Sequence, residues 1–314
     1  MTFTRMHSPH ASDRGQAGEQ PNFRLEVNGN PVTVLFSCLG DGDTGGGLVA
    51  YDGRELSVLD RKSTTGMCAS SQELVRMLWA PSQTDTGTVI VHYDAGGVRN
   101  KFWVPGLVDP HDILWTGSEY VAISSLLDSV LWIDPAGRIF RRQQFSSGED
   151  CWHLNCLVSD KDSLYATCFG RFTESRAWKS TLTAGSGVLF DLACGDDIVG
   201  SLCCPHSPRR YDGEWAICCS STSELRFYRA GESQPSRLVR LKDWVRGLLR
   251  TDHYYIVGES VNRLQSEEVR GATVAFLRRE TLELAGRITL PFRAVYDIVP
   301  VSEELIASIR RSSL

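Results

Sequence analysis

The sequence lacks the features that mark membrane, secreted and nucleic-acid-binding proteins. No run approaches the roughly eighteen consecutive apolar residues of a membrane-spanning helix, and the first residues contain no apolar core of a secretory signal. The 33 lysines and arginines are outnumbered by 38 acidic residues, so a net charge of −5 provides no basic field for an anionic polymer or surface. We therefore expect a cytoplasmic protein that binds neither nucleic acid nor membrane and that begins with a disordered tail over residues 1–22.

The ten cysteines lack the spacing of a metal or disulfide framework. No Cys-x-x-Cys occurs, and two pairs are adjacent, Cys203-Cys204 and Cys218-Cys219. Neighbouring residues of a strand point to opposite faces of the sheet, so such a pair cannot easily bind one tetrahedral ion. A reducing compartment also disfavours disulfides. We therefore expect most of the cysteines to be small apolar residues inside strands.

Long helical periodicity is nearly absent as well, and a repeated β pattern takes its place. The chain has 314 residues, 42% hydrophobic and 23% charged, which is typical of a globular protein with a large core. Each of six segments contains a β-rich run, a polar turn and a second run, which is the pattern of a hairpin. They cover residues 46–61, 87–104, 129–145, 187–202, 223–241 and 272–290. Their spacing of about forty to fifty residues indicates an internal repeat.

Two further short strands precede several of these hairpins. The second strands lie at 119–125, 163–170, 214–220 and 254–260, and each follows a first strand and a polar turn. Four strands in each of six repeats predict an all-β fold, a six-bladed β-propeller that forms a single domain over residues 23–314. A pair of β-sandwiches is the alternative, but it would not require near-equal repeats.

The two ends of the chain indicate how the ring closes. Residues 293–309 look like a first and a second strand with no hairpin after them, whereas the N-terminal part begins with "NPVTVLFSCLG" before its hairpin. We therefore expect one blade to combine strands from both ends of the chain. Which end supplies the second strand of this blade stays open.

The repeat gives meaning to three histidine-containing strings, "VDPHDILW", "GEDCWHLNCL" and "CCPHSPRR". In a propeller the innermost strands surround a central channel, and their first residues meet at one mouth of it. Aligned, the repeats begin at Met67, His111, His153, His206, Arg246 and Tyr296. Three of the seven histidines thus take equivalent positions, and we expect them to lie together at the mouth.

Three interpretations of the histidine cluster remain open. In the first, His111, His153 and His206 bind a divalent transition metal ion, such as Zn, Fe, Mn or Ni, with Asp109, Asp112 or Asp150 nearby. In the second, no metal is needed, and one histidine acts as general acid or base while an arginine holds an anionic substrate. In the third, the histidines only cap strand ends and bridge blades. Under the first two interpretations the catalytic residues are His111, His153, His206, Asp150 and Asp112, and no nucleotide cofactor is indicated.

The substrate would be held by residues around the same mouth. Arg209 and Arg246 are the expected anchors of an anionic group. Asn155 shares a strand face with His153, and Glu259 ends a second strand. Two long loops, 170–187 and 261–271, either cover the mouth or are solvated insertions. As a cover these loops would carry Arg171, Arg176, Trp178, Arg263 and Glu268. In all, the expected substrate-binding residues are Arg209, Arg246, Asn155, Glu259, Tyr296, Arg176 and Trp178.

Two strings also resemble a known family. "DCWHLNCL" is similar to the "HLNGL" segment, and "PHSPRRYDGEWAICCSSTSEL" to the "PHSPRWHDGRLWVLDSGTGEL" segment, of bacterial proteins known only as conserved hypothetical proteins. The resemblance covers most of the chain from about residue 105, including "RG", "VGES" and "YDIVPV", although Cys-Trp precedes His153 where the family commonly has Arg-Cys. It implies a propeller-type domain and no established reaction. More distantly, the expected fold is similar to that of strictosidine synthase, gluconolactonase and paraoxonase, which work at this mouth, often with a metal.

These observations favour an enzyme that transforms a small molecule, as an isomerase, lyase or hydrolase in a bacterial biosynthetic pathway. Its substrate would be polar or anionic and would bind at the axial mouth of the propeller. The alternative is a non-catalytic propeller that serves as a ligand-binding or protein-interaction scaffold. That alternative predicts exposed aromatic patches on the blades in place of a polar funnel.

Overall fold

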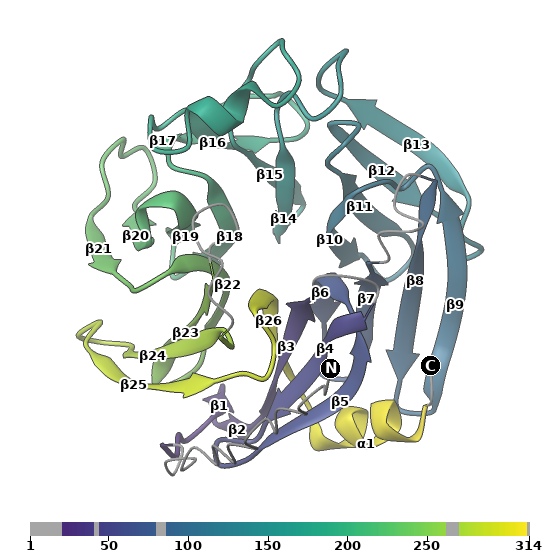
Figure 1. Cartoon of the computed structure of the whole chain (residues 1–314), viewed down its shortest axis with the longest axis vertical. Coiled ribbons are helices and arrows are strands. Elements are labelled where there is room, and N and C mark those ends of the chain that lie inside the picture. Colours follow the sequence, from purple (N-terminus) through teal and green to yellow (C-terminus); the bar gives the residue numbers. More distant parts are fainter. Residues whose placement is uncertain (1–20, 41–43, 80–85, 262–269, 313–314) are drawn as a thin grey trace, which may run out of the picture.

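A computed structural model describes residues 21–40, 44–79, 86–261 and 270–312, and within them six four-stranded antiparallel sheets form a ring (Figure 1). The predicted six-bladed β-propeller is therefore confirmed. Residues 1–20 of the expected tail, and Arg263 and Glu268 of the expected cover, lie outside the described residues.

Each blade has four strands, ordered from the channel outward. Blade 1 contains β26 (Ala294–Val301), β3 (Thr33–Leu39), β4 (Thr44–Tyr51) and β5 (Leu56–Lys62), and blade 2 contains β6 (Thr64–Ala69), β7 (Leu74–Leu78), β8 (Gly87–Asp94) and β9 (Gly97–Pro105). Blade 3 contains β10 (Pro110–Trp115), β11 (Tyr120–Ser124), β12 (Ser129–Ile133) and β13 (Ile139–Gln144), and blade 4 contains β14 (Leu154–Asp160), β15 (Ser163–Cys168), β16 (Gly187–Asp191) and β17 (Asp197–Leu202). Blade 5 contains β18 (Pro205–Tyr211), β19 (Glu214–Cys219), β20 (Glu224–Tyr228) and β21 (Arg237–Arg240), and blade 6 contains β22 (Trp244–Arg250), β23 (Tyr254–Ser260), β24 (Thr273–Arg278) and β25 (Leu284–Thr289). The remaining elements are a small hairpin of β1 (Glu26–Val27) and β2 (Asn30–Pro31), the short helices η1 (Ala177–Ser180) and η2 (Ser220–Thr222), and helix α1 (Glu303–Arg311).

The apolar core lies between neighbouring blades. Strands β11 and β12 are buried along their whole length, whereas the outer strand β13 is largely exposed. One cluster joins Val75 and Ile90 of blade 2 to Ile113 and Tyr120 of blade 3. Because both faces of an inner strand meet a neighbouring blade, its residues are apolar on both sides, and only the outer strands alternate with solvent.

The cysteines fill these layers, as expected. All ten are free, and Cys194 is the exposed one. Cys218 and Cys219 belong to different apolar clusters because successive residues of β19 face opposite neighbours.

The N-terminal part of the chain closes the ring. Strand β3 pairs with β26 from Ala294↔Leu39 to Val301↔Thr33, so the N-terminal part supplies the second, third and fourth strands of blade 1. The expectation of a second C-terminal strand is wrong, because residues 303–311 form helix α1. The helix is capped by Ser302, whose side chain accepts from the Leu305 N–H, and acidic residues begin it while arginines end it. None of the described helices is long and apolar enough to cross a membrane.

A one-residue irregularity occurs near the start of every innermost strand and defines two rings of side chains. The strand pairing places six residues at equivalent positions next to the mouth of the channel. We call them the mouth ring: Thr65, His111, Asn155, His206, Arg246 and Tyr296. The next residues form the deep ring: Gly66, Asp112, Cys156, Ser207, Gly247 and Asp297. The predicted alignment therefore holds for four residues and fails for Met67 and His153. His153 precedes β14 in a left-handed turn (φ 50°), so Asn155 takes the level of the other two histidines.

Candidate functional site

A pocket of about 330 Å³ opens at the mouth of the channel. Its walls contain Leu39, Thr65, Trp79, Asp109, Pro110, His111, His153, Trp178, Trp244, Arg246, Ser260, Val261 and Tyr296. Five of the expected site residues thus lie together: His111, His153, Trp178, Arg246 and Tyr296. Three tryptophans among the lining residues make much of the wall flat and apolar, which is typical of a small-molecule site.

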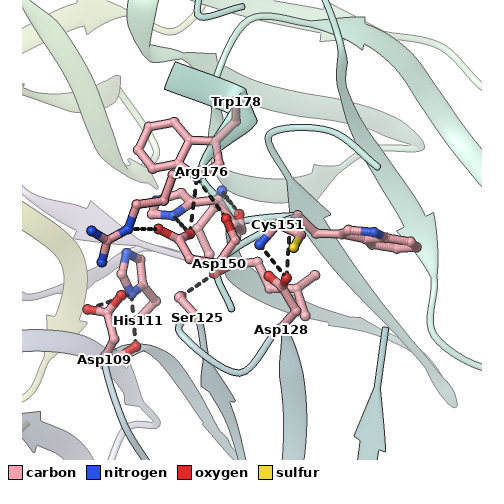
Figure 2. Close-up of polar contacts among 12 residues, drawn as sticks. Asp109, His111, Ser125, Asp128, Asp150, Cys151, Arg176 and Trp178 are labelled. Carbon is pink, nitrogen blue, oxygen red and sulfur yellow. Dashed lines mark hydrogen bonds and ion pairs between the residues drawn. The ribbon is translucent and has the colours of Figure 1, made fainter. Parts of the chain in front are cut away.

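His153 is paired with Asp150 at the edge of this pocket. Its Nδ1 lies 2.7 Å from Oδ1 of Asp150, which also accepts from Nε1 of Trp178 at 3.1 Å. Nε of Arg176 donates to the other carboxylate oxygen at 3.1 Å, so the side chains of the 170–187 loop meet on Asp150 (Figure 2). Burial raises the pKa of Asp150, but the hydrogen bonds from His153 and Trp178 outweigh it and leave the pKa below its ordinary value. The carboxylate is ionised and holds a proton on Nδ1 of His153, which leaves Nε2 available as a base.

Aromatic rings fix the imidazole of His153 in place. Its ring centre lies 4.2 Å from that of Trp178 and 4.4 Å from that of Phe169. The imidazole of His111 meets it edge-on at 5.1 Å. These contacts restrict the rotation of His153, so the direction of its free nitrogen is set before any ligand binds.

His111 is held in its neutral form. Its Nδ1 lies 3.1 Å from the backbone oxygen of Asp109, which can only accept, so we assign the proton to Nδ1. Burial lowers the pKa of His111, and the Asp109 carboxylate only partly opposes this effect. Nε2 of His111 therefore offers a second neutral acceptor next to His153.

His206 does not join the other two histidines. It is 4% exposed, does not line the pocket, and shares its Nδ1 between the Cys204 backbone oxygen at 3.1 Å and Oγ of Ser220 at 2.7 Å. The ring of Phe169 contacts both His153 and His206, at 4.4 and 5.3 Å. Across the described parts of the chain, no three His, Cys, Asp or Glu side chains come together in a way that could hold a metal ion. The expected three-histidine ligand set for a divalent metal therefore does not fit this geometry.

Arg246 and Tyr296 form the adjoining part of the wall, where the Tyr296 ring meets the His111 ring edge-on at 5.7 Å. The guanidinium carbon of Arg246 lies 4.2 Å from the centre of the Tyr296 ring, and its Nε donates to the Val295 backbone oxygen at 2.7 Å. Burial raises the pKa of Tyr296 well above its ordinary range, despite the opposing charge of Arg246. The phenol therefore stays protonated beside a fixed positive charge.

Asp112 and Arg209 lie elsewhere, which corrects their expected roles. They line a second pocket of about 250 Å³ farther along the innermost strands, together with Asp297. The Asp112 carboxylate accepts the backbone N–H groups of Ile113 and Leu157, each at 2.8 Å, and contacts no histidine. Arg209 donates to Asp297 at 2.9 Å. The error arises because a side chain one or three positions along a strand faces another layer of the channel.

Asn155 and Glu259 serve the framework. Asn155 is fully buried, accepts from Oγ1 of Thr167 at 2.6 Å, and donates to the His153 backbone oxygen at 3.2 Å, so it supports the turn that carries His153. Glu259, also fully buried, pairs with Arg287 at 2.7 Å inside blade 6. Neither residue lines the mouth pocket.

The expected residues of the 170–187 loop lie in two places, at the mouth pocket and on the side of blade 4. Trp178, in η1, reaches the pocket wall, and Arg176 contacts Asp150 with a side chain that is 55% exposed. Arg171 pairs with Asp197 at 2.6 Å and lies over the Trp152 ring, so it belongs to the side of blade 4.

Sequence reasoning missed several residues of the pocket wall. Trp244 begins β22, two positions before Arg246, so the start of an innermost strand was an available signal for it. Thr65 escaped notice because the alignment of its blade was two residues out of register. Trp79 follows a second strand and carries no distinguishing pattern.

The ring of blades and the histidine-containing pocket at its mouth define a six-bladed β-propeller with an axial site of small-molecule size. A family model described as "Domain of unknown function (DUF4915)" matches residues 57–285, and the chain belongs to this family. The expected resemblance to a family without an established reaction is thereby confirmed. No curated protein matches the sequence.

Solved structures share the fold at low sequence identity. A protein of unknown function from Bacteroides caccae has a TM-score of 0.60 and 12% identity, covering 87% of this chain and all of that one. A "putative 6-phosphogluconolactonase" from Bacteroides fragilis has a TM-score of 0.60 and 11% identity, covering 86% of this chain and 98% of that one. A chain of a nidogen/laminin complex gives the same TM-score, identity and coverage. At such identities the likeness concerns the fold alone.

Proposed function

We propose that this protein is an enzyme that transforms a small anionic molecule in the mouth pocket by acid–base catalysis without a metal. The observation that carries the proposal is the contact of 2.7 Å between His153 Nδ1 and Asp150 Oδ1 at the pocket wall. A histidine oriented by a buried carboxylate is a common general base, because the carboxylate selects the tautomer and stabilises the imidazolium that forms.

The proposed steps use only residues of this chain. Nε2 of His153 takes a proton from the substrate or from a water molecule, while Asp150 holds the proton on Nδ1. The imidazolium then returns the proton to the leaving or rearranged atom. Arg246 holds the anionic group of the substrate, and the tryptophans exclude water from the apolar part.

Hydrolysis is the reaction class to test first, ahead of isomerisation and elimination. A base beside an open pocket can activate water for attack on an ester or a lactone. The fold-level neighbours named "putative 6-phosphogluconolactonase" are compatible with this choice and do not establish it. The cytoplasmic location and the absence of nucleic-acid and membrane partners stay predictions of the sequence.

The test is hydrolysis of a panel of lactones and carboxylate-bearing esters, followed by proton release. We expect His153→Asn to lower kcat by about 100-fold or more against any hydrolysed compound. The matched control is His253→Asn, since His253 also pairs with an acid, Glu26 at 3.3 Å, but at an exposed site outside the pocket. Equal activity of the two variants would remove His153 from catalysis.

A binding scaffold is the second candidate. Two large aromatic side chains, Trp103 of β9 and Phe140 of β13, are 39% and 57% exposed on outer strands of adjacent blades. Exposed aromatic residues are common in interfaces between proteins. If turnover is absent for the whole panel and Trp103→Ser with Phe140→Ser abolishes binding of a protein partner, the scaffold replaces the enzyme.

A further inference from the structure

Two hydroxyl groups of the mouth pocket have no hydrogen-bond partner within the described chain. They are Oγ1 of Thr65 and Oη of Tyr296, and the two residues are 1% and 7% exposed. Buried polar groups in folded proteins are nearly always hydrogen-bonded, so an unpaired one needs an explanation. Both residues line the mouth pocket, which makes a bound molecule the missing partner to consider.

Other unpaired buried atoms differ from these two. They include atoms of Arg76, His92, Asp128 and Trp215. None of those residues lines the mouth pocket. Among the residues that the structure describes, the mouth pocket is therefore where two hydroxyl side chains without a partner lie together.

The two hydroxyls stand next to a positive charge. Thr65 and Tyr296 occupy the same level of neighbouring blades, because both belong to the mouth ring. Arg246 of the next blade stacks on the Tyr296 ring, with 4.2 Å from its guanidinium carbon to the ring centre. A molecule that places an anionic group against Arg246 thus brings its adjacent atoms toward the hydroxyls.

The chemistry of the hydroxyls limits what those adjacent atoms can be. The phenol of Tyr296 stays protonated and donates a hydrogen bond, and the threonine hydroxyl can donate or accept. Both hydroxyls can therefore form a hydrogen bond to an oxygen atom of the bound molecule. A pocket of about 330 Å³ walled by tryptophans leaves room for only a short apolar remainder.

We propose that the hydroxyls of Thr65 and Tyr296 bind the oxygen substituent of a 2-hydroxy or 2-oxo carboxylic acid whose carboxylate faces Arg246. This proposal rests on the proposed function in one respect, because it takes Arg246 as the anchor of the anionic group. It adds the class of acid that the mouth pocket binds, which in a hydrolysis is the product acid, and two specificity-determining residues.

Three probes of equal length test the proposal by calorimetry: hexanoate, 2-hydroxyhexanoate and 2-oxohexanoate. We expect at least one oxygen-bearing acid to bind about tenfold more tightly than hexanoate, and the two arms decide between a hydroxyl and a carbonyl oxygen. Tyr296→Phe and Thr65→Val should bring that acid down to the affinity of hexanoate while hexanoate itself binds unchanged. Arg246→Gln should weaken all three acids.

Melting temperatures separate ligand binding from a structural role. Tyr296→Phe and Thr65→Val remove an unpaired buried hydroxyl, so the free variants should melt at or above the wild-type temperature. The matched controls have partners: Tyr120 Oη lies 2.8 Å from His92 Nδ1, and Thr167 Oγ1 lies 2.6 Å from Asn155 Oδ1. Tyr120→Phe and Thr167→Val should therefore melt lower.

The proposal is overturned if the three acids bind equally, if none binds, or if both hydroxyl variants keep the preference. A lower melting temperature of the two hydroxyl variants, with unchanged binding, would likewise assign them to the framework. These measurements need no turnover. A loss of activity in His153→Asn together with equal binding of the acids would thus leave the proposed function standing and remove only the proposed class of acid.

Discussion

The mouth ring and the deep ring occupy successive positions on the same six strands, but two side chains of the mouth ring lack the hydrogen-bond partners that every polar side chain of the deep ring has. In the deep ring, side chains bond to the backbone of the following blade: Asp112 to the Leu157 N–H at 2.8 Å, and Ser207 to the Gly247 N–H at 2.8 Å. Cys156 accepts from the Ser207 N–H at 3.2 Å, and Asp297 accepts from the Met67 N–H. In the mouth ring, Thr65 and Tyr296 have no such partner.

Glycine occupies the two positions of the deep ring that lack such a bond. A Cβ on Gly66 would lie 2.5 Å from the Asp112 Cα, and one on Gly247 would lie 2.7 Å from Cγ1 of Ile298. At these junctions the blades are close enough to contact directly. The deep ring of small and acidic residues therefore joins the blades at every position, whereas the mouth ring of larger polar residues joins them at Arg246 and leaves the hydroxyls of Thr65 and Tyr296 for a ligand.

The largest expected effect is the loss of Asp297 from the deep ring. Asp297→Ala leaves the partly buried Arg209 without its carboxylate, 2.9 Å away, and the Met67 and Ile298 N–H groups without an acceptor. Removing one partner of a buried ion pair costs about 3–5 kcal/mol of unfolding free energy. Chemical denaturation measures this. A cost no greater than that of the exposed-pair variant Asp134→Ala would contradict the role of the deep ring.

The repeat and its hairpins could be predicted because alternation and polar turns are local properties of the sequence. The positions of His111, His206, Arg246 and Tyr296 followed from the repeat alone. Helix α1 could not be foreseen in this way, since Leu305, Ile306 and Ile309 form an apolar stripe too short to separate from a strand.

The errors in the site have two physical causes. Two residues before the mouth ring, blades 3 and 5 have Asp109 and Cys204 in a left-handed conformation, and in blade 4 His153 takes this position. His153 is therefore two residues out of register with His111 and His206, and nothing in the spacing reveals it. Phe169, from the end of a second strand, enters between two histidines that are aligned in sequence. Contacts of this kind depend on side chains from other strands, which a repeat alignment does not describe.

The next largest effect concerns the mouth. Asp150→Asn keeps the size of the side chain but removes the negative charge that holds the proton on His153 Nδ1. We expect kcat per folded molecule against the hydrolysed substrate to fall about 100-fold, and the melting temperature to fall as well, because the amide cannot replace all the hydrogen bonds of the buried carboxylate. The surface variant Asp134→Asn should retain full activity. Comparable activity of the two would mean that Asp150 has only a structural role.

A smaller effect is expected at Ser207 of the deep ring. Ser207→Ala leaves the Gly247 N–H without its acceptor, which costs about 1–3 kcal/mol of unfolding free energy for a buried group. Activity per folded molecule should not change. Ser118→Ala on an exposed turn is the control. A large loss of activity at unchanged stability would show that the two rings are coupled, contrary to the comparison.

The smallest expected effect is a pH dependence that also distinguishes the rings. Burial, followed by the charge of Asp297, raises the pKa of Asp112 to about 8. A carboxyl that binds its proton more tightly when folded contributes stability that is present in acid and is lost as the pH rises from about 4 to about 8. Asp112→Asn cannot titrate, so its melting temperature should lie farther below wild type at pH 5 than at pH 8. Asp150 has a lowered pKa, so Asp150→Asn should show no larger deficit at pH 5 than at pH 8. If the melting-temperature deficits of both variants change with pH in the same direction, Asp112 does not carry a proton in the folded protein that Asp150 lacks.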